Sequence, residues 1–260
     1  MKILEIRSLE KTKLEGTALK CSISCLLYYF INLIFTYLIK YISLKVPQIV
    51  DIIFQIIFVI ISIPFGYGIT SNIIKISDSK TDSVTKFLDD FILNFGKYLK
   101  LIAHEIIRLI IPIILCLIST FYLLGTFTAY INAKNFLCFS KNLLPLALIF
   151  FIVTLIIFIY FFLNYVIVQF IYFNSDKKED SKNILDTSKE KMKGHKFDFI
   201  RLILSFIPFF LFVGILLAIA GSFLTYEYMM PIIIVLYTII KPHITVSELL
   251  FTEEIGDIKK

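Results

Sequence analysis

Residues 143–173 read LLPLALIFFIVTLIIFIYFFLNYVIVQFIYF, a run without a single charged side chain. A helix needs about 20 apolar residues to cross the roughly 30 Å hydrocarbon core of a bilayer. At about 1.5 Å per residue this run is longer than one crossing requires, so we expect it to tilt strongly, to project beyond the bilayer, or both. The stretch predicts a transmembrane helix.

The remaining sequence repeats this pattern. Of the 260 residues, 58% are hydrophobic, which is more apolar surface than a soluble domain of this size can bury. We therefore predict an all-α, polytopic transmembrane helical bundle that forms one integral membrane domain. The predicted spans are residues 22–42, 49–69, 101–125, 143–173, 197–221 and 223–240. Pro64, Gly66 and Gly68 predict that the second helix bends or ends early.

Lysine and arginine orient the predicted spans. Short loops rich in these residues stay on the cytoplasmic side of a membrane. The N-terminal segment and the second and fourth loops are basic, whereas the first, third and fifth loops carry few or no basic residues. This alternation predicts that both termini are cytoplasmic. The net charge of +6 then reflects topology and attraction to anionic lipid headgroups, so we expect no nucleic-acid partner.

Three segments between or before the spans have an amphipathic helical pattern: residues 1–19, 82–100 and 181–192. In the second, Phe87, Phe91 and Phe95 recur at helical spacing, which predicts a helix lying along the cytoplasmic headgroup layer. Gly194 follows the third segment, where a helix commonly ends. Such helices either anchor and space the spans or form a regulatory or partner-docking surface.

A family resemblance follows from several of these stretches. Met192 to Phe210, MKGHKFDFIRLILSFIPFF, resembles the segment leading into a late span of the bacterial membrane proteins grouped as domain of unknown function 975. Ile6 to Leu19 and Phe87 to Lys100 are similar to that family's amphipathic helices, and Ile63 to Gly68 is similar to its turn. The resemblance implies a multi-pass protein of the bacterial plasma membrane without an established activity. A remoter likeness to the membrane domain of some glycerophosphodiester phosphodiesterases suggests a lipid-related setting.

Motifs for catalysis are absent from the sequence. No phosphate-binding glycine loop, nucleophile elbow or H-E-x-x-H motif occurs. His104 and Glu105 begin like a zinc-protease motif, but Arg108 occupies the position of its second histidine. Cys21 and Cys25 lie one helical turn apart without a second ligand pair, so we expect packing residues rather than a zinc site. We predict a protein that is not an enzyme and has no cofactor.

Two groups of polar residues are candidate sites. The first lies near the predicted cytoplasmic membrane surface and comprises His104, Glu105, Arg108, Lys193, His195 and Lys196. Glu105 and Arg108 are three residues apart on one helix and can pair. These residues either anchor the helices at the interface and pair internally, or bind a lipid headgroup or a solute.

The second group, Asp51, Asn164 and Glu227, lies within or beside predicted spans. Such residues line a polar pathway or, more often, hydrogen-bond between neighbouring helices. Our leading hypothesis is a non-enzymatic protein that acts through membrane lipids or other membrane proteins. The alternative is a transporter or permease for a small solute or lipid, in which these three residues converge on one cavity. Gly214 and Ala218 predict close approach of another helix, within the chain or in a dimer.

Overall fold

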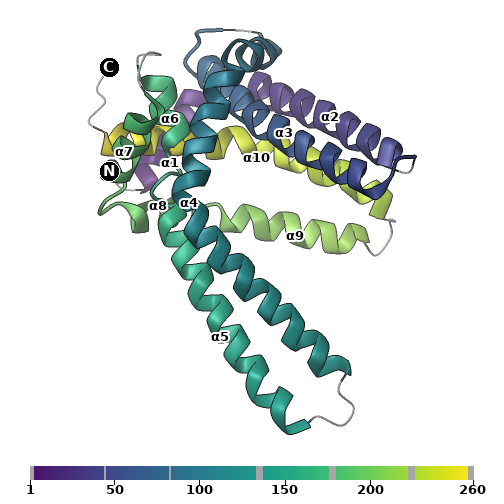
Figure 1. Cartoon of the computed structure of the whole chain (residues 1–260). Helices are drawn as coiled ribbons and strands as arrows, with labels where there is room; N and C mark the ends of the chain where they lie inside the picture. The colour runs from purple at the N-terminus through teal and green to yellow at the C-terminus, as the bar shows by residue number, and fades with distance from the viewer. Residues whose placement is uncertain are drawn as a thin grey trace. The chain divides into compact units, whose positions relative to one another are not determined.

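The computed structural model describes residues 3–43, 45–81, 83–132, 137–175, 180–221 and 226–256 (Figure 1). Within these ranges the chain forms α-helices joined by turns, without a β-strand, which confirms the all-α prediction. The contacts divide the chain into two compact units. Unit one comprises Met1–Lys100, Gln169–Lys178 and Phe197–Lys260, and unit two comprises Leu101–Val168 and Glu179–Lys196.

The helices follow one another without long intervening segments. Their bounds are α1 Ile3–Leu14, α2 Ala18–Ser43, α3 Gln48–Ser77, α4 Lys86–Asn132, α5 Leu137–Phe162, α6 Val168–Asn174, α7 Ser181–Lys191, α8 Lys196–Leu204, α9 Ile207–Gly221 and α10 Tyr226–Ile255.

Six helical stretches of the described chain are long and apolar enough to cross a membrane, as the sequence predicts. They are Ala18–Ile42, Ile49–Ser77, Lys86–Tyr130, Leu143–Phe162, Lys196–Ile219 and Pro231–Ile255. In the apolar 18-residue segment of each stretch, only 11% to 39% of the residues are buried within the chain. Apolar surface left uncovered in this way is suited to contact with lipid tails.

Two helix ends differ from the predicted ones. α3 does not end early but continues through Pro64 to Ser77. A proline removes one backbone donor, and packing of α3 against α2 and α10 offsets that loss. The predicted long fourth helix instead ends at Phe162, and residues 163–167 form turns before α6. There the Ser188 hydroxyl of α7 donates to the carbonyl of Asn164 at 2.7 Å, which satisfies an acceptor that the helix end leaves free.

The other differences concern three helices. Residues 82–100 and 101–125, expected as separate elements, belong to the single helix α4, because the buried face formed by Tyr98, Leu101 and Ile102 continues across their boundary at helical spacing. The fifth span is interrupted by a turn between α8 and α9. The sixth helix continues to Ile255 rather than ending near residue 240, because α1 packs along its second half.

Residues 3–14 and 181–191 are helical as predicted, and Gly194 adopts a φ of +92° after α7.

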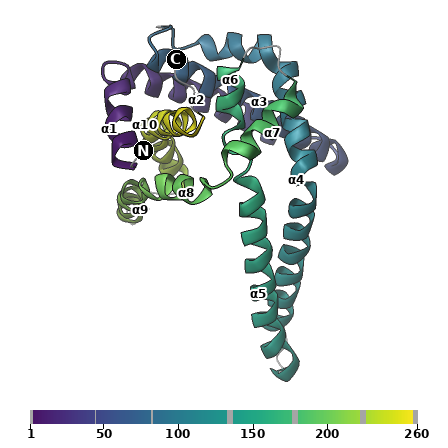
Figure 2. The same cartoon turned by 90° about the vertical axis from the view of Figure 1, so that its left-hand side faces the viewer.

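The buried core of unit one lies at one end of its helices. α2, α3 and α10 lie side by side, and α1 packs on α10 (Figures 1 and 2). Leu14 of α1, Cys21 and Cys25 of α2, Ile73 of α3 and Val246 of α10 are buried there in one cluster. We call this end, where α1, the start of α2, the end of α3 and residues 241–255 of α10 meet, the capped end.

α9 carries the predicted small-residue face. Nothing lies within 4 Å of the position that a Cβ atom would take on Gly214. The described part of the chain therefore supplies no helix that approaches Gly214 closely, in contrast to the expectation of an intramolecular neighbour.

Candidate functional site

A pocket of about 220 Å³ opens beside the core of unit one. α2 contributes Cys25, Tyr28 and Tyr29, which lie on one face of the helix because they are three or four residues apart. α3 contributes a second such set, which includes Gly66, Tyr67 and Thr70; α6 adds Gln169 and α10 adds Lys241. Tyrosine, glutamine and lysine side chains thus line the space.

Lys241 is the cation of this pocket. Its side chain is partly buried, and it makes no hydrogen bond or ion pair with any residue that the structure describes. The acidic residue that acts on it electrostatically is Glu248, two turns further along α10. Gln169 likewise has no side-chain hydrogen bond to a described residue. The pocket therefore presents an ammonium group and an amide whose hydrogen-bonding capacity is free for a ligand.

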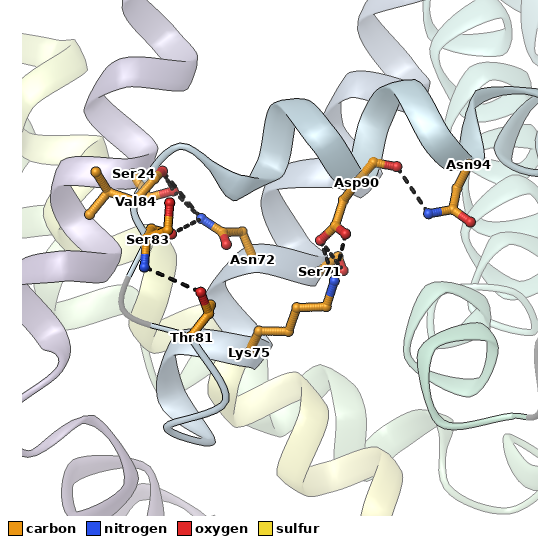
Figure 3. Close-up of polar contacts among 9 residues, drawn as sticks. All are labelled: Ser24, Ser71, Asn72, Lys75, Thr81, Ser83, Val84, Asp90 and Asn94. Carbon is orange, nitrogen blue, oxygen red and sulfur yellow. Dashed lines mark hydrogen bonds and ion pairs between the residues drawn. The ribbon is translucent and has the colours of Figure 1, made fainter.

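Asn72 links the helices that carry the pocket. It is fully buried, and its Nδ2 atom donates to the Ser24 hydroxyl of α2 at 2.8 Å and to the carbonyl oxygens of Ser83 and Val84 at 3.4 and 3.2 Å (Figure 3). Ser24 donates in turn to the Val84 carbonyl at 2.8 Å. These bonds fix α2, α3 and the segment before α4 in one arrangement, so the faces of α2 and α3 that line the pocket keep their register.

A second contact in Figure 3 involves a lysine that already has an acidic partner. Lys75 of α3 donates to Asp90 of α4 at 2.6 Å, and the Ser71 hydroxyl donates to the same carboxylate at 3.0 Å. Asp90 is 6% exposed, and burying a carboxylate is unfavourable unless it is paired. Lys75 thus neutralises the buried carboxylate of Asp90, whereas Lys241 has no such ion pair with a described residue.

Glu10 holds α1 against α10. Its carboxylate is 1% exposed, accepts a hydrogen bond from Ser247 at 3.0 Å, and contacts His243 and Arg7. The Arg7 guanidinium also lies 4.0 Å from the centre of the Phe206 ring. His243 is therefore part of a helix-joining contact, a role that the sequence did not suggest.

The predicted interfacial cluster belongs to unit two, where its members have different partners. Arg108 donates to Asp186 of α7 at 2.5 Å and to the Lys182 carbonyl at 3.4 Å. His104 and Glu105 lie on α4 about one turn before it. The Arg108 guanidinium lowers the pKa of Asp186 below its ordinary value, because it hydrogen-bonds to the ionised carboxylate.

The basic residues that follow α7 form the other part of that cluster. Lys193 and His195 are exposed in the turn between α7 and α8. Lys196 donates to the carbonyl of Tyr160 at 3.1 Å, and its ammonium lies 3.3 Å from the centre of the Tyr160 ring. Arg108 is thus bonded to α7 and Lys196 to α5.

The predicted intramembrane residues have local partners where the structure describes them. Asp51 accepts a hydrogen bond from Gln55 at 2.9 Å, one turn along α3. Asn164, 7% exposed, lies in the turns after α5, and its amide is 3.5 Å from the Tyr160 carbonyl. The side chain of Glu227 lies outside the described residues. Neither Asp51 nor Asn164 lines the Lys241 pocket.

Six helical stretches in the described part of the chain are long and apolar enough to span a membrane, which defines its class as a multi-pass membrane protein. The family described as "Protein of unknown function (DUF975)" matches residues 1–257, and the chain belongs to that family. No curated protein and no solved structure matches the chain. The family description assigns no activity, so a function has to be argued from the pocket and its surroundings.

Proposed function

We propose that this chain is a non-enzymatic membrane protein that acts through lipids, and that it binds the anionic headgroup of a membrane phospholipid in the Lys241 pocket. The observation that carries the proposal is an ammonium group without an ion pair to the described chain, in a pocket that is also lined by Gln169. A phosphate accepts hydrogen bonds from an ammonium group and from an amide N–H. Charge-assisted bonds of this type are about twice as strong as neutral ones.

The depth of the pocket supports a headgroup as the ligand. Cys25 is seven residues from the start of α2, and Thr70 is seven residues from the end of α3. At 1.5 Å per residue, both lie about 10 Å inside the capped end. The polar network around Asn72 and Asp90 occupies the same end, which supports a position of that end in the headgroup layer rather than in hydrocarbon. A lysine at this depth extends its ammonium toward phosphate.

The orientation of the capped end is part of the proposal. Basic residues concentrate on the segments that lead to and from this end, so it faces the cytoplasm. The cytoplasmic leaflet carries the anionic lipids, and each juxtamembrane lysine near it contributes about 1 kcal/mol of attraction. The Lys241 pocket would therefore select phosphatidylglycerol over a zwitterionic lipid.

Native mass spectrometry of the protein in mixed phosphatidylglycerol and phosphatidylcholine nanodiscs tests this proposal. Lys241→Gln should lower the retained phosphatidylglycerol about fivefold, which corresponds to the loss of about 1 kcal/mol. Lys97→Gln removes an equal charge from an exposed position of α4 and should have little effect. Equal retention by all three proteins would contradict headgroup binding. Displacement of the lipid by millimolar inorganic phosphate would identify free phosphate as the ligand instead.

A further inference from the structure

A second concave surface of unit one lies on the other side of α3 from the Lys241 pocket. It is a groove of about 380 Å³ between α2, α3 and the start of α4. Its α3 wall includes Phe54, Phe58, Ile61 and Phe65, whereas the Lys241 pocket uses the face with Gly66 and Thr70. At 100° per residue these two sets point to opposite sides of the helix. The groove is therefore a separate site.

The length of the groove matches one leaflet of a membrane. Its α2 wall extends from Ile31 to Ile42, which at 1.5 Å per residue is about 16 Å. The hydrocarbon core of a bilayer is about 30 Å thick, so one leaflet contributes about 15 Å. Both walls belong to membrane-spanning stretches, so the groove is surrounded by lipid tails.

Two polar residues lie near one end of this apolar groove, the end closed by Leu88, Phe91 and Ile92 of α4. Ser62 is one turn from Phe65, whose ring packs 5.1 Å from that of Phe91. The Ser62 hydroxyl is buried and has no hydrogen-bond partner among the residues that the structure describes.

A buried hydroxyl without a partner costs about 1–3 kcal/mol, so a ligand group that bonds to it would stabilise the bound state. Asn32, on the opposite wall, already donates to the Tyr28 carbonyl at 3.0 Å. The free donor at this level of the groove is thus the Ser62 hydroxyl.

We propose that this groove holds one acyl chain of a membrane phospholipid, with the ester carbonyl beside Ser62 and the tail directed toward Ile42 and Phe54. The ester carbonyl accepts a hydrogen bond from the Ser62 hydroxyl, which has no acceptor among the described residues. The methylene groups of the tail cover the apolar walls of the groove. The groove is about as long as one leaflet is thick, which suits a single acyl chain.

Photocrosslinking tests the acyl-chain site independently of the Lys241 pocket. The protein is reconstituted in phosphatidylcholine vesicles that contain phosphatidylcholine with a diazirine halfway along one chain, irradiated, and mapped by peptide mass spectrometry. Labels should concentrate on residues 31–42 and 54–65. Ile61→Phe fills the groove and should lower this labelling about fivefold, as expected for the loss of about 1 kcal/mol.

Matched variants keep the result interpretable. Ile60 is 47% exposed and Ile61 is 41% exposed, but only Ile61 lines the groove, so Ile60→Phe should leave the labelling unchanged. Ile57→Phe, a second groove-filling change, should reproduce the Ile61→Phe result. Lys241→Gln should not alter it, because that residue lies elsewhere. Three results would overturn the proposal. They are labels spread evenly over all spans, undiminished labelling of Ile61→Phe and Ile57→Phe, and labels that disappear when copies of the chain crosslink to one another.

Discussion

Glu10 of α1 and Ser247 of α10 are 237 positions apart in the sequence and hydrogen-bonded at 3.0 Å. Because His243 contacts the same carboxylate, one buried acid joins the N-terminal helix to the last one. Glu10→Ala should lower the free energy of unfolding by about 2–4 kcal/mol, since it leaves buried donors unpaired. Thermal unfolding in nanodiscs measures this change. Glu15→Ala, at an exposed position, is the control and should have an effect below about 0.5 kcal/mol.

Asn72 offers a second test of the capped end. Its amide bridges α2, α3 and the segment before α4, so Asn72→Ala should destabilise the protein by about 2 kcal/mol. Asn94 donates only to the Asp90 carbonyl within α4, so Asn94→Ala should have a smaller effect. Equal losses from the two substitutions would contradict the role of Asn72 as an interhelical link. The same unfolding assay distinguishes these outcomes.

Gly68 is required by the close approach of α3 and α4. A Cβ atom at this position would lie 2.8 Å from the Phe87 carbonyl oxygen, and the backbone cannot move aside freely. Gly68→Ala should therefore destabilise the protein by about 1–3 kcal/mol. Gly96 has open space around it, so Gly96→Ala should instead stabilise α4 by about 0.5–1 kcal/mol. We therefore expect the change in the free energy of unfolding to have opposite signs for the two glycine-to-alanine substitutions.

The contact between Arg108 and Asp186 predicts a dependence on pH. Arg108 lowers the pKa of Asp186 in the folded protein, so the stabilisation is present above the ordinary aspartate pKa and is lost as the pH falls through the lowered value. Asp186 is largely exposed, so the effect is local. Amide hydrogen exchange of α7, corrected for the intrinsic rate, should increase in that acidic range. Asp186→Asn should show fast exchange at all pH values, whereas an unchanged pH profile in this variant would contradict the assignment.

The sequence predicted the class and the number of membrane-length helical stretches because uninterrupted apolar runs are a local signal. It did not predict the full length of α10. Residues 241–255 include Lys241, Thr245, Ser247 and Glu248, which lower the hydropathy there. They remain helical because α1 and the core cover one side of the helix, and coverage by a segment more than two hundred residues away leaves no local pattern.

The candidate site could not be predicted from the sequence, because contacts between residues far apart in the chain leave no local pattern. The sequence indicated Arg108 and Lys196 as candidates because charged residues are unusual beside apolar runs. In the structure, however, both of them have hydrogen-bond partners. Lys241 occurs at the end of a predicted span, where a lysine is ordinary. Lys75 forms an ion pair with Asp90, whereas no described residue forms an ion pair with Lys241. Pairing of this kind becomes visible once the helices are placed in three dimensions.

The central claim is that the Lys241 pocket binds a phospholipid headgroup, and an experimental structure in phosphatidylglycerol nanodiscs tests it most directly. The account predicts a lipid phosphate about 2.7–2.9 Å from the Lys241 Nζ atom, the distance of a charge-assisted hydrogen bond. A structure in which Lys241 pairs with a carboxylate of the chain, while the pocket holds no phosphate, would contradict it.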